Sequence, residues 1–547
     1  MSGASHTLSA IFLQGTLALI PAHAQQPLSP PAPARSNLCN ADLTTPTNGD
    51  NLLAEKDYAA AKAHFREELA KNPNSADFRL GLIRALIGED EVIQARTEAD
   101  SWLANAPNDA LAEVAAGEVA YRNADIIAAQ QHANKAILEN RCEGRVLALA
   151  ANIDSLGAAF AQEANLIALA HRLRPNDEMI RRDWIFSLPL QERTAELARY
   201  LDETQHLSED DRTLYADDEE RLKAHHPGEC RVTSNTDTAS FPLKPVRTAN
   251  QASGLDVEIN SVNRRLEVDT GASGIVLTLA TAKKLGLKPE HRLFLGGVGD
   301  SRTVNSYLTH VANIRIGPFE FSDCLVEVLE KTRFNADGFI GTNLFAKWLV
   351  TLDYPRSELR LSPLPVIPKL TQPDNSGQSA DEAAVSEDEM SQPQNRYVAP
   401  EMQHWLRMLR IDNMLLVPVK LDHGPLHYFV ADTGSTQTTL SVTLARETHR
   451  EYMETGTHFF GIAGDVNKVY RVDDAVLHFG AFQLPPASYD AFDLSLLLQR
   501  TGLTVSGLLG LPTLARLTIS IDYRDNLMQL QYDPRHNTAT GSTVISF

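Results

Sequence analysis

The first half of the chain, from residue 51 to about residue 226, places apolar and small residues at helical spacing. The stretch from Tyr58 to Phe65 is an example. Turn signals interrupt this pattern every 34 residues, at Pro73, Pro107, Arg141 and Pro175. The pattern predicts an array of short helix pairs that bury a shared core over residues 51–226.

From residue 240 onward the pattern changes to short runs rich in β-branched and apolar residues, which indicate strands. Each run of this kind pairs with a second one across a turn, and a glycine-rich stretch and a closing strand follow. The whole series occurs twice. We therefore expect two all-β lobes, at residues 240–365 and 401–535. The fold class expected is a multidomain chain, all-α first and all-β after.

The triplet Asp-Thr-Gly ends the second strand of the first hairpin in each half, at Asp269 and again at Asp432. A single such triplet is a weak signal, because many turns contain it. Two copies, one small domain apart, suggest a pair of carboxylates. Close carboxylates cannot both ionise easily, so one can act as a base while the other acts as an acid.

The surroundings of the two triplets match over a whole domain. A Gly-apolar-apolar-Gly segment ends at Gly341 in the first half and at Gly510 in the second. An aspartate follows 12 residues after each of these glycines, at Asp353 and Asp522. The first triplet lies 72 residues before Gly341, and the second lies 78 residues before Gly510. This is an internal repeat of a domain rather than of a motif.

The order of these elements resembles that of the aspartic peptidases of the retropepsin and pepsin type. The resemblance covers about half of the chain. It implies that the two triplets meet at a pseudo-twofold axis, with Asp269 and Asp432 as the catalytic pair that activates a water molecule. The reaction implied is hydrolysis of a peptide bond, without a metal or other cofactor.

The resemblance also implies roles for other residues. The threonines of the triplets would bond across the axis, and several glycines would let the backbone approach the carboxylates closely. These supporting residues are Thr270, Gly271, Thr433, Gly434, Gly341 and Gly510. Glycines of two flap tips would close over an extended peptide. The flap candidates are Gly297, Gly299, Gly461 and Gly464.

The 34-residue period of the first half resembles that of tetratricopeptide repeats, although the third boundary has Arg141 in place of proline. The resemblance implies a concave face that binds an extended peptide or a partner protein. The alternative is a helical spacer with no binding role.

The remaining segments are read from their composition. Residues 1–24 resemble a secretory signal, residues 25–50 a flexible leader, and residues 366–400 an acidic disordered linker between the lobes. We therefore expect a periplasmic or secreted protein with no membrane span in the mature chain. The long linker also leaves open whether each lobe pairs within one chain or with a second chain.

The 547-residue chain has a formal net charge of −20, which argues against nucleic acid as a partner. Its four cysteines lie far apart and allow two disulfides in three connectivities. No spacing typical of a metal site occurs. The leading hypothesis is an exported aspartic endopeptidase whose helical repeats bind a substrate or partner. The alternatives are a protease-fold scaffold that no longer cuts and a protein that processes only itself.

Overall fold

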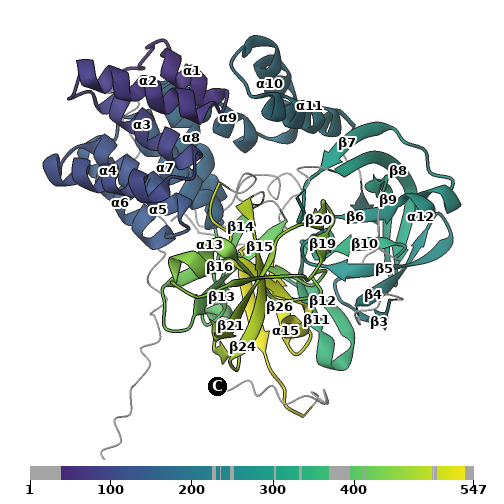
Figure 1. Ribbon diagram of the computed structural model, residues 1–547. Coiled ribbons are helices and arrows are strands. Elements are labelled where there is room, and N and C mark those ends of the chain that lie inside the picture. The colour runs from purple at the N-terminus through teal and green to yellow at the C-terminus, as the bar shows by residue number, and fades with distance from the viewer. Residues whose placement is uncertain are drawn as a thin grey trace, which may run out of the picture.

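The computed structural model describes residues 39–224, 230–233, 236–246, 252–300, 304–331, 336–368, 395–411, 413–495, 497 and 502–535. The expected signal segment, most of the leader and residues 369–394 of the expected linker lie outside these ranges. Helices fill the first part of the chain and strands the rest, so the fold class expected from the sequence is confirmed. Figure 1 shows the helices arched over the strands.

Eight of the helices follow one another with the 34-residue period. The second helices of successive pairs begin at Tyr58, Val92, Ile126 and Ile126's counterpart Phe160, and each is followed by a turn at an expected boundary. The helices are α1 (Asn48–Ala54), α2 (Tyr58–Lys71), α3 (Ala76–Gly88), α4 (Val92–Asn105), α5 (Ala110–Arg122), α6 (Ile126–Glu139), α7 (Gly144–Leu156), α8 (Phe160–Leu173), α9 (Glu178–Ser187), α10 (Leu190–Glu203) and α11 (Glu209–Ala224). Aspartates or a serine accept the free amides at several helix starts, including Asp57, Ser75 and Asp125.

Residues 39–50 are anchored, so the expectation of a flexible leader does not hold for this stretch. Cys39 forms a disulfide with Cys142, which lies at the repeat boundary that lacks a proline. The amide of Asp42 donates to the carbonyl of Leu173 at 2.7 Å, and Thr47 caps α1. A cross-link that spans 103 residues was not visible from local sequence patterns.

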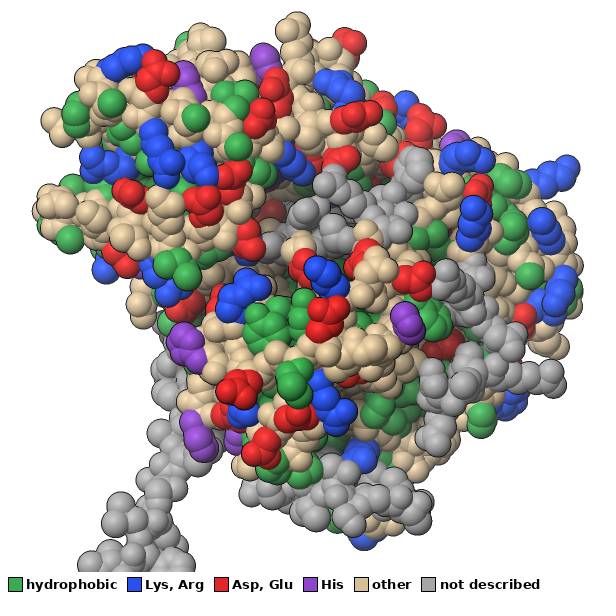
Figure 2. All heavy atoms as spheres, viewed as in Figure 1, with side chains coloured by type: hydrophobic (Ala, Val, Ile, Leu, Met, Phe, Trp, Pro, Cys, Tyr) green, Lys and Arg blue, Asp and Glu red, His purple; other side chains and the backbone are tan. Residues whose placement is uncertain are grey.

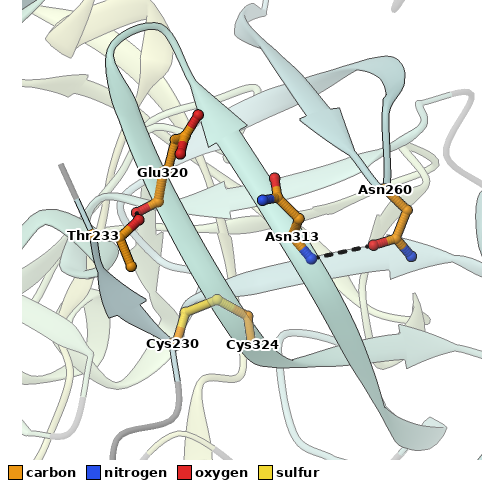
Figure 3. The surroundings of a disulfide bond; sticks show 6 residues. All are labelled: Cys230, Thr233, Asn260, Asn313, Glu320 and Cys324. Carbon is orange, nitrogen blue, oxygen red and sulfur yellow. Dashed lines mark hydrogen bonds between the residues drawn. A yellow bond between two sulfur atoms is a disulfide. The ribbon is translucent and has the colours of Figure 1, made fainter.

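The first lobe is a nine-stranded sheet. Its strands are β1 (Arg231–Val232), β3 (Lys244–Pro245), β4 (Ser253–Ile259), β5 (Val262–Asp269), β6 (Ile275–Thr278), β7 (His291–Leu295), β8 (Val304–Ile316), β9 (Phe319–Leu329) and β10 (Gly338–Gly341), with helix α12 (Leu279–Lys284). A second disulfide, Cys230–Cys324, fastens β1 to β9, and the amide of Thr233 continues that edge by donating to the carbonyl of Glu320 (Figure 3).

The second lobe repeats this arrangement in a ten-stranded sheet. Its strands are β14 (Leu409–Ile411), β15 (Met414–Leu421), β16 (Leu426–Asp432), β17 (Thr439–Ser441), β18 (Met453–Thr455), β21 (Val469–Ala475), β22 (Leu477–Phe479), β23 (Phe482–Gln483), β24 (Ala487–Phe492) and β25 (Gly507–Gly510), with helices α13 (Val442–Glu447) and α15 (Leu511–Leu514). A separate hairpin, β19 (Phe459–Gly461) and β20 (Gly464–Val466), projects from it.

A six-stranded sheet joins the two lobes. It contains β2 (Ala239–Pro242), β11 (Trp348–Asp353) and β12 (Glu358–Pro363) from the first half, and β13 (Leu406–Arg407), β26 (Thr518–Asp522) and β27 (Leu527–Gln531) from the second. The closing strands β11 and β26 pair directly and antiparallel, with Val350 opposite Ile521. One apolar core runs through residues of both lobes. The lobes of this chain therefore pair with each other.

The helical region packs on both lobes. Apolar residues of α5 to α9 share a buried cluster with residues of the second lobe such as Met414, Tyr428 and Phe492. At the other end, Ala224 of α11 packs with Leu293 of β7 and Leu308 of β8. The first helices, α1 to α4, bury their apolar side chains against other helices. The concave face expected to bind a peptide is thus partly occupied by the protein's own second lobe.

In Figure 2, acidic and basic side chains alternate over the helices, so the net charge is not gathered into one patch on this face. Among the described residues, no helix is both long enough and apolar enough to cross a membrane.

Candidate active site

Asp269 and Asp432 lie at equivalent ends of strands β5 and β16. In each lobe the strand that ends in the aspartate runs parallel to the strand that ends in the predicted glycine. Gly341 lies beside Asp269 in this register, and Gly510 lies beside Asp432. The structure thus brings together the two carboxylates and the glycines behind them, which are far apart in the sequence.

The threonines of the two triplets lock the two loops together. The hydroxyl of Thr270 donates to the carbonyl of Ala431 at 2.7 Å and accepts the amide of Thr433 at 3.0 Å. The hydroxyl of Thr433 does the same in return, donating to the carbonyl of Val268 at 3.1 Å and accepting the amide of Thr270 at 3.0 Å. Both threonines are buried. Four reciprocal hydrogen bonds therefore fix the separation of the carboxylates.

The glycines of the triplets serve two purposes. The amide of Gly271 donates to Asp269 Oδ1 at 2.7 Å, and the amides of Gly434 and Ser435 donate to Asp432 Oδ1 at 3.0 Å each. A Cβ on Gly434 would stand 2.5 Å from Asp269 Oδ2, on the opposite lobe. Glycine at this position lets each loop approach the other lobe's carboxylate.

The loops are supported from behind by Gly341 and Gly510. A Cβ on Gly341 would overlap the carbonyl of Ala272, and one on Gly510 would overlap the carbonyl of Gln437. The amide of Gly341 donates to the carbonyl of Gly274 at 2.7 Å. Sequence reasoning did not single out two side chains that complete this support. Asn343 Oδ1 accepts the amide of Gly274 at 2.9 Å, and Thr438 Oγ1 accepts the amide of Gly510 at 3.0 Å.

The two carboxyl groups influence each other's ionisation. Burial raises the pKa of Asp269, and the hydrogen bonds that it accepts oppose this rise. The pKa of Asp432 lies well above its ordinary value because of burial and because of the negative charge of Asp269. The carboxyl groups also hydrogen-bond to each other. Such a pair titrates as a unit and holds one shared proton between its two steps.

The flap candidates meet each other above this pair. The amide of Ala463, at the tip of the β19–β20 hairpin, donates to the carbonyl of Val298 at 2.9 Å, and the amide of Asp300 donates to the carbonyl of Asp465 at 2.9 Å. Gly299 has a φ of 142°, which a side chain would disfavour. A Cβ on Gly461 would overlap the carbonyl of Val298. Of the four predicted flap glycines, Gly297, Gly299 and Gly461 therefore make the close contacts, while Gly464 forms the turn with a φ of 103°.

The tip of the second flap also reaches the first lobe. Ile462 packs with Ala272, the residue after the first triplet, against a cluster of Val276, Leu329 and Phe339. No group of histidine, cysteine and acidic side chains able to hold a metal ion occurs in the described part of the chain.

Comparison with protein families agrees with this architecture. Residues 255–344 match the family model described as aspartyl protease, and residues 52–117 match the one described as tetratricopeptide repeat. The chain carries an aspartyl-protease domain of the retropepsin-like kind and tetratricopeptide repeats. The matched protease segment contains Asp269 and Gly341 of the first lobe. The second lobe is assigned by the repeated topology described above.

Two solved structures of aspartic proteases are similar to parts of the chain. An aspartic proteinase from Irpex lacteus is 12% identical, covers 56% of this chain and 100% of its own, and has a TM-score of 0.35. A retropepsin-like aspartic protease from Rickettsia conorii is 20% identical, covers 24% of this chain and 94% of its own, and has a TM-score of 0.19. A search of curated proteins found no significant match.

Proposed function

We propose that the protein is an aspartic endopeptidase that cleaves peptide bonds with the Asp269–Asp432 pair. The observation that carries this proposal is the pairing of two buried carboxyl groups from two lobes of one chain, held by the reciprocal hydrogen bonds of Thr270 and Thr433. A pair that shares one proton supplies both a base and an acid at the same place.

The proposed reaction needs no covalent intermediate. The ionised carboxylate takes a proton from a water molecule held between the two aspartates as the water attacks the peptide carbonyl. The protonated carboxyl donates its proton to the carbonyl oxygen. The two flap tips would have to separate to admit an extended peptide and then close over it, which excludes bulk water.

Export to the periplasm or to the exterior is part of the proposal. The apolar segment within residues 1–24 supports it, and so do the disulfides Cys39–Cys142 and Cys230–Cys324, because such bonds persist in oxidising compartments.

The helical repeats are proposed to bind the substrate or a partner protein through the first helices. Helices α1 to α4 support this assignment because their buried apolar residues pack within the helical region, whereas α5 to α9 are committed to the second lobe.

The proposal is tested by cleavage of casein and of a peptide library between pH 3 and 7. We expect the wild type to cut and the variants Asp269→Asn and Asp432→Asn each to lose the activity. The exposed Asp256, which pairs with Lys244 and Arg265 on the first lobe, provides a matched control as Asp256→Asn. A natively folded wild type that cuts nothing at any pH would instead favour the scaffold alternative.

A further inference from the structure

Strand β5 carries a third acidic side chain beside the catalytic pair. Leu266 and Val268 belong to the apolar core of the first lobe. Successive side chains of a strand point to opposite faces, so Glu267 lies on the same face as Asp269. That face is the one turned toward the cleft. Glu267 is therefore the residue on the cleft wall immediately before the catalytic aspartate.

The carboxyl group of Glu267 is buried without a partner. The side chain is 7% exposed, and it makes no hydrogen bond or ion pair within the described parts of the chain. Its neighbours on the adjoining strands are Gly254 on β4 and Phe339 on β10, and neither can supply a charge or a proton donor from its side chain. Burial, and then the charge of Asp269, raise the pKa of Glu267 to about 7. An unpartnered buried carboxyl is costly to keep unless something binds it.

The surroundings of Glu267 are apolar. Phe339 packs with Val276 and Leu329, and Ile462 of the second flap covers this cluster. A pocket with apolar walls and one carboxyl suits a side chain with an aliphatic stem and a cationic head. Lysine and arginine have this form.

The second lobe offers no equivalent acid. The residue two positions before Asp432 is Val430, which is buried in an apolar cluster. Its neighbour on the parallel strand is Leu508, which corresponds to Phe339. The cleft is therefore acidic on the first-lobe side of the catalytic pair and apolar at the matching position of the other.

We propose that Glu267 makes the first-lobe side of the cleft a pocket for a lysine or arginine side chain next to the scissile bond. The inference rests on the proposed peptidase function and names its substrate class, which is a peptide with a basic residue at one of the two positions that flank the cut. On binding, the cationic head pairs with the carboxylate of Glu267, while Ile462 moves with the flap to make room.

The test compares peptides that carry either lysine or norleucine at each position flanking the scissile bond. Norleucine keeps the aliphatic stem and removes the charge. We would measure kcat/KM for cleavable peptides, and Kd for matching peptides whose scissile bond is a non-cleavable reduced amide. The proteins are the wild type, Glu267→Gln and Glu267→Met, with Glu258→Gln on the neighbouring strand β4 as the control. Glu258 lies near Arg315 and away from the catalytic pair.

The expected result is a preference of the wild type for lysine over norleucine, at one flanking position, of at least about tenfold in kcat/KM and in Kd. Both substitutions of Glu267 should reduce this preference by about tenfold or more, and Glu258→Gln should keep it. Equal ratios in the wild type and in Glu267→Gln, or a preference for norleucine, would overturn the inference. Cleavage without a lysine preference sinks only the pocket, selective binding without cleavage sinks only the peptidase function, and binding of neither peptide contradicts both.

Discussion

At the residue scale, each half of the catalytic pair depends on atoms of the other lobe. Thr433 accepts the amide of Thr270 and donates to the carbonyl of Val268. The Cα of Gly434 leaves the space in which Asp269 Oδ2 lies. The geometry of the two carboxylates is therefore a property of the pair of loops and not of either triplet alone.

Removing one hydroxyl of this lock should destabilise the protein. In Thr433→Val the buried amide of Thr270 loses its acceptor, so we expect the free energy of unfolding to fall by about 2 kcal/mol. Thr433→Ser keeps the hydroxyl and should lose much less. Urea unfolding followed by tryptophan fluorescence measures both values, and equal stabilities of the two variants would contradict the role of the hydroxyl.

Asp154 should make stability depend on pH. This residue of α7 is 3% exposed, one of its carboxylate oxygens has no partner within the described residues, and burial raises its pKa to about 7. Because the folded-state pKa lies above the unfolded one, the protonated form favours folding, and that stability is lost as the pH rises from about 4 through 7. We expect Asp154→Asn to be more stable than the wild type by about 2 kcal/mol at pH 8.

The advantage of Asp154→Asn should shrink toward pH 4, where the wild-type carboxyl is protonated as well. Thermal unfolding across this range measures it, with the exposed Asp202 changed to Asn as the control. An advantage that is the same at pH 4 and pH 8 would mean that burial of the charge is not the cause.

Single residues differed in how far the sequence could predict them. The carboxylates, threonines and glycines of the two triplets could be proposed because each occurs twice at matching offsets. Glu267 occurs once, and its counterpart Val430 is apolar, so the repeat gave no reason to notice it. Its importance depends on which face of β5 it occupies and on which neighbours it meets, and both follow from pairing with distant strands.

At the element scale, the two flaps form one closed unit. Backbone hydrogen bonds join Val298 to Ala463 and Asp300 to Asp465, and the amide of Asn467 donates to Asp300 Oδ2 at 2.7 Å. Sequence reasoning located both glycine-rich stretches. It could not predict their mutual contact, because contact between loop tips depends on how the lobes are oriented.

A methyl group at the flap contact should open it. In Gly461→Ala the new Cβ meets the carbonyl of Val298, whereas in Gly456→Ala it meets nothing within 4 Å. We expect Gly461→Ala to speed hydrogen exchange of the amides of Asp300 and Ala463 by about tenfold, and to lower kcat/KM for peptides because closure is weakened. Gly456→Ala is the matched control. Unchanged exchange in Gly461→Ala would show that the flap tips do not meet in solution.

The helices were predicted well because their signal is local. The 34-residue period of the turns reflects one helix pair per repeat, and the observed helices keep that period from Tyr58 to Leu173. Helices α9 to α11 have no such period, and their packing against β7 and the second lobe depends on contacts that are distant in the sequence.

At the scale of the whole molecule, the helical region braces both lobes. Residues of α5 to α9 cover apolar side chains of the second lobe, and α11 packs on β7, the strand that leads into the first flap. The helices, the lobes and the flaps are therefore mechanically connected (Figure 1).

Removing the helical region should destabilise the protease lobes. A chain that begins at residue 230 would expose Met414, Tyr428 and their neighbours to water, so we expect it to aggregate or to melt well below the full chain. Thermal unfolding and size-exclusion chromatography of both chains measure this. A truncated chain that is monomeric and as stable as the full one would contradict the bracing role.

The most direct test of the central claim, that Asp269 and Asp432 of one chain form the catalytic pair, is a mixing experiment. Equal amounts of Asp269→Asn and Asp432→Asn would be unfolded together, refolded and assayed for peptide cleavage beside the wild type treated in the same way. We predict that the wild type recovers its activity, with a specific activity independent of its concentration, and that the mixture stays inactive. A mixture that regains about a quarter or more of the wild-type activity would show that the two aspartates meet between chains, and an inactive, natively folded wild type would contradict the catalytic pair itself.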